Sequence, residues 1–232
     1  MQARDIMSAP VISVTEDTPI VEVAQLLVRH GISGVPVLAA DGRLVGIVSE
    51  GDLVRRIEIG TDRQPSWWLR LLGGSEEQAR DYVKTHGRTV SDVMSRKVAT
   101  VSEDAGLAEI AALLERRHIK RVPVMRGKEV VGIVSRANLL QAIASTPAAL
   151  VPESTDAKER DRALKVRVEE EMERAGLDTV FFNVIVADGV VALWGAVRSE
   201  AQLQAARAAA ATVTGDPARV QMHMSVQPMP MV

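Results

Sequence analysis

The sequence predicts a mixed α/β (α+β) fold: two pseudo-symmetric β-α-β-β-α repeats that form one module, followed by a small α-β-β-α-β domain. The first observation is an internal repeat, because DIMSAPVISVTED at residues 5–17 returns as DVMSRKVATVSED at residues 92–104, a shift of 92 − 5 = 87 residues. The second is a proline-, serine- and alanine-rich segment at residues 146–155, after which the apolar pattern changes. Two such long repeats usually bury each other's apolar faces and leave a cleft between them.

The first repeat, residues 1–58, is expected to begin with a short strand at Pro10–Val14. A helix follows, with Thr18 as its N-cap and Pro19 at its first position, where a missing N–H costs nothing. Gly31 is placed to end this helix. Its apolar face is predicted by the helical spacing of Ile20, Val23, Ala24 and Leu27.

Two strands are then expected at residues 35–38 and 44–48, joined by a turn at residues 40–43, before a second helix opens at Gly51. The second repeat, residues 89–145, reproduces the helix face with Leu107, Ile110, Ala111 and Leu114 and the strands with Val122–Met125 and Val130–Val134. Such continuously apolar strands predict a sheet covered by helices.

An insertion at residues 59–88 separates the repeats and ends in a helical pattern at Glu76–His86. It carries Trp67 and Trp68 in a chain with only 3% aromatic residues. Tryptophan is enriched at interface hot spots, so the pair is either a subunit contact or the packing of the insertion itself. Residues 146–155 are expected to form a linker.

The last domain, residues 156–228, is predicted to begin with a helix that Gly176 ends. Strands at residues 180–187 and 190–197 flank Asp188-Gly189, a strong signal for a tight hairpin. Ser199 is expected to cap a second helix, and alternating residues from Val220 to Val226 predict a half-buried strand. The first helix should bury Leu164, Val168, Met172 and Ala175, and the second Leu203, Ala206, Ala210 and Val213.

The bulk properties exclude several classes of function. The net charge of −2 provides no basic field for nucleic acid, and the absence of cysteine excludes disulfides and thiolate metal sites. No apolar stretch resembles a signal peptide or a membrane span, so a cytoplasmic location is expected. The four histidines lack metal-ligand spacing, and Ile47 occupies the position where a nucleophile elbow around Ser49 would need glycine. We therefore expect no metal, no catalytic residues and no enzymatic activity.

The doubled pattern resembles a tandem pair of CBS domains. The resemblance rests on Met7-Ser8 and Met94-Ser95, on Val-Pro-Val at residues 35–37 and 122–124, and on GIVSEGD at residues 46–52. The DGVVALWGAV segment at residues 188–197 resembles a BON domain. Here Gly215-Asp216-Pro217 replaces the glycine-valine pair that usually precedes the last BON strand. The order CBS, CBS, BON is similar to that of a family of bacterial proteins.

The CBS resemblance implies an adenosine compound, such as AMP, ADP or ATP, bound between the repeats as a regulatory ligand. It makes Asp52 the ribose ligand, because a carboxylate can accept from both ribose hydroxyls, and it places Ser49 near the ribose or phosphate. An aspartate that merely caps a helix is the alternative. The second motif has Asn138 in place of the aspartate and loses the charge, so that site should be weaker, altered or empty.

Phosphate requires positive charge, which Lys120 and Arg121 would supply; a solvated basic loop is the alternative. The resemblance places adenine between residues 11–13 and residues 35–37. The full set of expected ligand-binding residues is Ser49, Asp52, Val11, Ile12, Ser13, Val35, Pro36, Val37, Lys120, Arg121, Ser135, Arg136 and Asn138.

The leading hypothesis is a regulatory protein that senses an adenosyl ligand and relays occupancy to the BON domain or to an unidentified protein partner. Repeats of this kind commonly pair again, so a homodimer is expected. The alternative is a lipid- or envelope-binding protein driven by the BON domain, with the CBS pair as a dimerisation scaffold. The sequence lacks a basic amphipathic helix, which counts against the alternative. Thermal shift with nucleotides and co-sedimentation with anionic vesicles would discriminate between the two.

Overall fold

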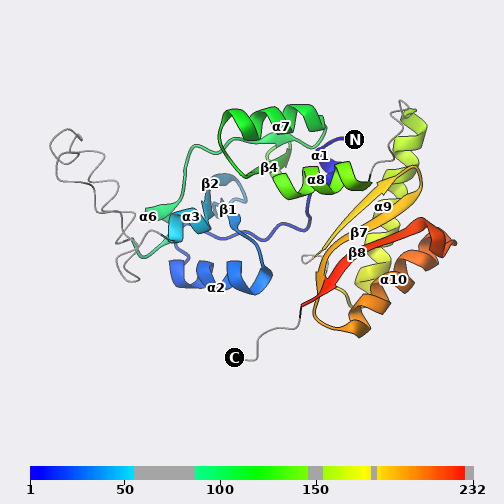
Figure 1. Ribbon diagram of the computed structural model, residues 1–232. Coiled ribbons are helices and arrows are strands. Elements are labelled where there is room, and N and C mark those ends of the chain that lie inside the picture. Colours follow the sequence, from blue (N-terminus) through cyan, green and yellow to red (C-terminus); the bar gives the residue numbers. More distant parts are fainter. Residues whose placement is uncertain (55–86, 146–153, 179–181, 228–232) are drawn as a thin grey trace. The chain divides into compact units, whose positions relative to one another are not determined.

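The computed structural model describes residues 1–54, 87–145, 154–178 and 182–227. It divides into two compact units, one formed by Ile12–Val98 and the other by Met1–Val11 together with Ala99–Val232 (Figure 1). Helices and strands are mixed in both, which confirms the predicted α/β class. The tryptophan pair, the expected helix at Glu76–His86 and most of the expected linker lie outside the described residues.

Among its described residues, the Ile12–Val98 unit contains an antiparallel strand pair and three helices. Gly31 ends the first helix with a left-handed φ of 61°, as predicted. Val35, Val37 and Val48 fill the core beneath this helix. The elements are α2 (Ile20–His30), β1 (Gly34–Leu38), β2 (Leu44–Ser49), α3 (Glu50–Leu53) and α6 (Val90–Val93).

Three local predictions for this unit were wrong. The expected strand at Pro10–Val14 is reduced to a single bridge between Val14 and Val37. Thr18 does not cap α2: its hydroxyl accepts from the backbone N–H of Thr15, and Pro19 occupies the N-cap position. Ala24 is exposed, so the buried face of α2 is narrower than predicted.

The other unit contains the second repeat and the C-terminal domain. In the repeat, β3 lies parallel to β4 and β4 antiparallel to β5, and Ile110, Leu114 and Val124 lie in the core. Ala111 is exposed, contrary to prediction. The elements are β3 (Val101–Ser102), α7 (Leu107–Arg116), β4 (Arg121–Arg126), β5 (Glu129–Ser135) and α8 (Arg136–Ser145).

The compact units do not follow the sequence repeats. The helix α1 (Ala3–Ile6) buries Ala3 and Ile6 in the core of the second repeat, although it precedes the first repeat in sequence. Correspondingly, α6 buries Val90 and Val93 in the core of the first. Each Met-Ser pair therefore lies against a strand of the other repeat. Ser8 forms a bridge with Ile133 of β5, and Ser95 forms one with Ile47 of β2.

Two glycines make room for the methionines that follow α1 and α6: Gly132 lies against Met7, and Gly46 lies against Met94. A Cβ at Gly132 would lie 2.7 Å from Met7 Cγ and 2.9 Å from Met7 Cβ, whereas one at Gly46 would lie 3.2 and 3.4 Å from the same atoms of Met94. We expect Gly132→Ala to lower the free energy of unfolding by about 1–3 kcal/mol, the usual cost of overpacking, and Gly46→Ala to cost less. Urea denaturation of both variants tests this, and a larger loss from Gly46→Ala would contradict it.

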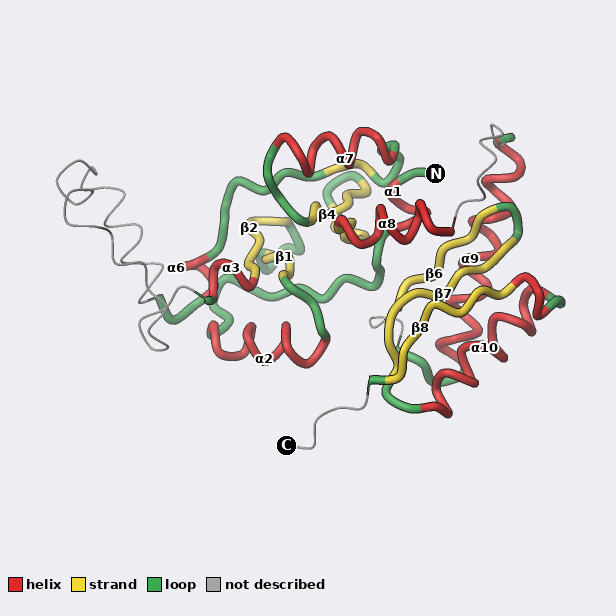
Figure 2. Tube along the Cα trace, viewed as in Figure 1, coloured by secondary structure: helices red, strands yellow, loops and turns green. Residues whose placement is uncertain are grey.

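The C-terminal domain is a three-stranded sheet covered on one face by two helices (Figure 2). The predicted hairpin is confirmed, because Asp188 and Gly189 have φ values of 50° and 73°. Ser199 accepts from the backbone N–H of Gln202 and caps the second helix as predicted. The elements are α9 (Thr155–Arg174), β6 (Phe182–Ala187), β7 (Val190–Val197), α10 (Glu200–Thr214), η3 (Pro217–Arg219) and β8 (Val220–Val226).

The helix-facing side of this sheet is apolar, as predicted: Val168 and Met172 of α9 and Ala206 and Ala210 of α10 are buried against it, although Ala175 is exposed. The strand β8 alternates between half-buried and exposed residues, whereas every residue of β6 is buried. The outer face of β6 must therefore be covered by another element. Within the described residues, no helix has the length and hydropathy needed to cross a bilayer.

Candidate functional site

The first motif forms a compact turn at the start of α3. Both the backbone N–H and the hydroxyl of Ser49 donate to Asp52 Oδ2, over 3.0 and 2.8 Å. The turn exists because Ser49 ends β2 and Asp52 occupies the third position of the short helix, which is the arrangement of a capping box. Asp52 is half-buried, and the two bonds from Ser49 orient its carboxylate.

The second motif has the same turn but a different side chain in it. Asn138 Oδ1 accepts from the backbone N–H and the hydroxyl of Ser135, over 2.8 and 2.7 Å, as Asp52 does from Ser49. In addition, Asn138 Nδ2 donates to Ser8 Oγ over 3.2 Å. Asn138 is only 5% exposed. A neutral amide tolerates such burial, whereas a carboxylate would incur a desolvation cost.

The basic residues gather at the edge of the second repeat. Arg121 pairs with Ser135 across β4 and β5, and the backbone N–H of Arg136 donates to Lys120 O over 3.1 Å. Lys120 and Arg136 are exposed, and Arg121 is half-buried. The turn thus brings three cationic residues close to the Ser135–Asn138 motif, all within one compact unit.

The residues expected to bind adenine differ in their exposure to solvent and in the compact unit to which they belong. Val35 and Val37 have no exposed surface, so their side chains belong to the core of the Ile12–Val98 unit and could offer a ligand only backbone atoms. Pro36 is also buried, Ile12 is half-buried and Ser13 is exposed. Val11 is half-buried and belongs to the other unit.

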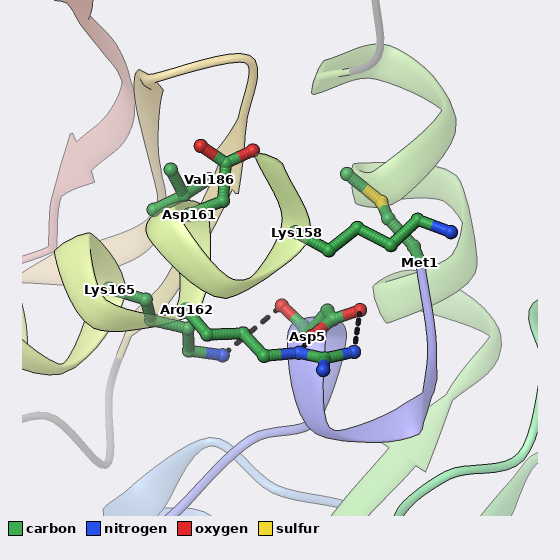
Figure 3. A pocket seen from close by; sticks show the side chains of 7 residues that line it. All are labelled: Met1, Asp5, Lys158, Asp161, Arg162, Lys165 and Val186. Atoms are coloured by element: carbon green, nitrogen blue, oxygen red, sulfur yellow. Dashed lines mark hydrogen bonds and ion pairs between the residues drawn. The ribbon is translucent and has the colours of Figure 1, made fainter. Parts of the chain in front are cut away.

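A small cavity lies elsewhere, between α1 and α9 (Figure 3). Its volume of about 20 Å³ is sufficient for one water molecule and far too small for a nucleoside. It is lined by Met1, Asp5, Lys158, Asp161, Arg162, Lys165 and Val186. Within the described residues, no group of three or more histidine, aspartate or glutamate side chains could hold a metal ion.

Two charged side chains in this cavity were not predicted. Arg162 Nε donates to Asp5 Oδ1 over 2.7 Å, and Lys165 Nζ donates to the carbonyl oxygens of Arg4 and Asp5. Burial raises the pKa of Asp5, but the hydrogen bonds from Arg162 and Gln2 and the charge of Arg162 lower it overall. Burial lowers the pKa of Lys165. No sequence signal could have identified these residues, because their partners lie more than 150 positions away.

Family comparisons match the two parts of the chain separately. The CBS domain family matches residues 3–59 and 90–145, and the BON domain family matches residues 160–228. An uncharacterized protein of Methanocaldococcus jannaschii is 35% identical over 154 residues, which are 62% of this chain and 91% of the relative. This chain belongs to the CBS domain family and carries a BON domain. The CBS pair and the BON domain are thus those that the sequence predicted.

Two plant proteins are also similar to the CBS pair. The chloroplastic CBS domain-containing protein CBSX1 of Arabidopsis thaliana is 30% identical over 131 residues, and the match spans 54% of this chain and 56% of that protein. A crystal structure of CBSX2 in complex with AMP is similar with a TM-score of 0.53 and 27% identity, over 62% of this chain and 96% of that chain. The matched CBSX2 structure therefore contains an adenine nucleotide.

Proposed function

We propose that this protein is a cytoplasmic, non-enzymatic regulator whose CBS pair binds an adenine nucleotide or related adenosyl compound through Asp52. The supporting observation is the fixed, half-buried carboxylate of Asp52 in a chain similar to CBSX2, which was solved with AMP. The protein requires no cofactor, and the ligand acts by occupancy. We also propose that the regulator is a homodimer, and that occupancy is relayed to the BON domain or to a partner protein.

Two kinds of group carry the chemistry of this proposal, and each lies within one compact unit. The Asp52 carboxylate would accept hydrogen bonds from the ribose hydroxyls, which are of the strong, charge-assisted kind. The Lys120, Arg121 and Arg136 group would attract phosphate, because it is the cationic edge beside the second motif.

This division predicts a selective effect of the cationic residues. Lys120→Ala combined with Arg121→Ala is expected to weaken AMP and ATP by about tenfold or more, since each lost charged hydrogen bond costs about 1.5–3 kcal/mol, and to leave adenosine nearly unchanged. Affinities of the three compounds for the parent and the double variant provide the test. An equal loss for all three would assign the pair to the fold.

The proposal as a whole can be tested by a thermal shift screen of the intact protein. AMP, ADP, ATP, S-adenosylmethionine and adenosine are compared with GMP as a base control and ribose 5-phosphate as a sugar control. We expect the adenosyl compounds to raise the melting temperature, because a ligand that binds only the folded state stabilises it. Equal stabilisation by the controls, or none by any compound, would contradict an adenosyl regulator.

A further inference from the structure

The outer face of the BON sheet at β6 is covered by the second CBS repeat. Helices α1 and α8 pack against β6, which explains why Ile185 and Ala187 are buried on the side away from the domain's own helices. Asn183, on the same strand, is also buried, and its Nδ2 donates to Ile6 O over 3.0 Å and to Gln141 Oε1 over 3.2 Å. This contact is therefore specific as well as apolar.

The helix α9 makes a second set of contacts, with the N-terminal segment. Figure 3 shows Arg162 and Lys165 extending from α9 toward α1. Arg162 donates both to Asp5 and to Gln2 Oε1, each over 2.7 Å. Lys165 Nζ lies 3.2 Å from Asp5 O, a carbonyl near the C-terminal end of α1. These charge-assisted hydrogen bonds from α9 to the α1 segment hold the BON domain against the N-terminal segment.

The helix α8 presents one polar face to these contacts. Asn138, Gln141 and Ser145 follow one another at spacings of three and four residues, which places them on the same side of a helix. Gln141 accepts from Asn183, and Ser145 Oγ accepts from Trp194 Nε1 over 2.8 Å. One face of α8 therefore carries both Asn138 of the second CBS motif and the two side chains that bond to the BON sheet, Gln141 and Ser145.

We propose that the second CBS motif of this chain serves to dock the BON domain, with Asn138 as the positioning residue. Asn138 holds Ser8, Ser8 ends the segment that contains α1, and α1 holds α9 through Asp5. Each polar atom of the Asn138 side chain has a protein partner, and the side chain is buried. The exchange of aspartate for asparagine suits this role, because a neutral amide can donate to Ser8 without burying a charge.

Trp194 provides a direct readout of docking. It is bonded to Ser145 and stacked on His223 with ring centroids 4.0 Å apart. The chain contains three tryptophans, so Trp67→Phe with Trp68→Phe leaves Trp194 as the only one. Its emission and its quenching by acrylamide, measured on the full chain at one fixed pH, report whether this face of the BON sheet is covered.

In this background we compare Asn138→Asp, Ser8→Ala and Arg162→Ala with a control, Arg167→Ala. Arg167 lies on the same helix as Arg162, but it donates to Val213 O within the BON domain. We expect the first three variants to shift Trp194 emission to the red and to increase its quenching, and the control to resemble the parent. Circular dichroism identifies any variant that fails to fold, and Ser8→Ala and Arg162→Ala then decide the question without Asn138→Asp.

Unchanged Trp194 emission in Ser8→Ala and Arg162→Ala would overturn the proposal, as would an equal shift in the control. The readout needs no nucleotide. Failure of docking therefore leaves the ligand proposal for Asp52 intact, and failure of nucleotide binding leaves the docking proposal intact.

Discussion

Replacement of Asp52 by alanine is expected to abolish high-affinity binding of an adenine nucleotide, whereas Asn138→Ala should change it little. The two residues occupy equivalent turns, but only Asp52 carries a charge, and Asn138 is occupied by Ser135 and Ser8. Loss of a charged hydrogen bond costs about 1.5–3 kcal/mol, which corresponds to a loss of affinity of about tenfold or more. Equal losses from both substitutions would contradict a single dominant ribose ligand.

The second motif itself supplies a sharper variant, Asp52→Asn. Alanine at this position would also remove the Asp52 side chain from the capping box of α3, and loss of a cap typically costs about 1 kcal/mol of stability. Asparagine keeps an oxygen for Ser49, since Asn138 forms the same two bonds with Ser135. Asp52→Asn should therefore retain the parent's melting temperature and lose affinity for the nucleotide. A variant that loses both would indicate that Asp52 acts mainly as a cap.

Replacement of Leu140 and Ile143 by serine is expected to dissociate the homodimer that we propose. Both residues lie on α8, three positions apart, and are 66% and 70% exposed. Neighbouring exposed apolar side chains of this kind are a candidate interface patch. Full burial of one such side chain contributes about 1.5–3 kcal/mol, and a symmetric interface would bury both residues from each subunit. Light scattering over a dilution series should show a dimer for the parent and a monomer for the variant.

Val166→Ser is the matched control, because Val166 is a comparably exposed apolar residue on α9 of the BON domain. Val21 and Val28 of α2 are also exposed, at 63% and 84%, and can be replaced in the same way.

Trp67→Ala with Trp68→Ala tests the insertion separately. If that variant loses melting temperature but remains dimeric, the tryptophans pack within one subunit. A Leu140 and Ile143 variant that stays dimeric at every dilution would exclude α8 from the interface.

The sequence predicted the elements that depend on local chemistry. Gly31 ended its helix, Asp188-Gly189 formed its hairpin and Ser199 capped α10, because each acts through backbone conformation or a bond to a neighbour. The turn at Asp52 was likewise predictable from the spacing of Ser49 and Asp52, which lie three positions apart. Thr18 shows the limit of this reasoning, since its hydroxyl had two competing local partners and bonded to Thr15.

Features that depend on distant residues were not predictable. The exchange of α1 and α6 between repeats is invisible in sequence, because each helix lies beside its own repeat in the chain. The docking role of Asn138 depends on Ser8, 130 positions away, and that of Arg162 on Asp5, 157 positions away. The sequence shows that Asn138 lacks the charge of Asp52, but only the structure shows its hydrogen bond to Ser8.

The most direct test of the adenosyl regulator is calorimetric titration of the intact protein with AMP and ATP, in parallel with the Asp52→Asn and Asn138→Ala variants. We expect one dominant equivalent of nucleotide per chain, retained in Asn138→Ala and lost in Asp52→Asn. Two equal sites per chain, no binding to the parent, or binding that survives Asp52→Asn would contradict it.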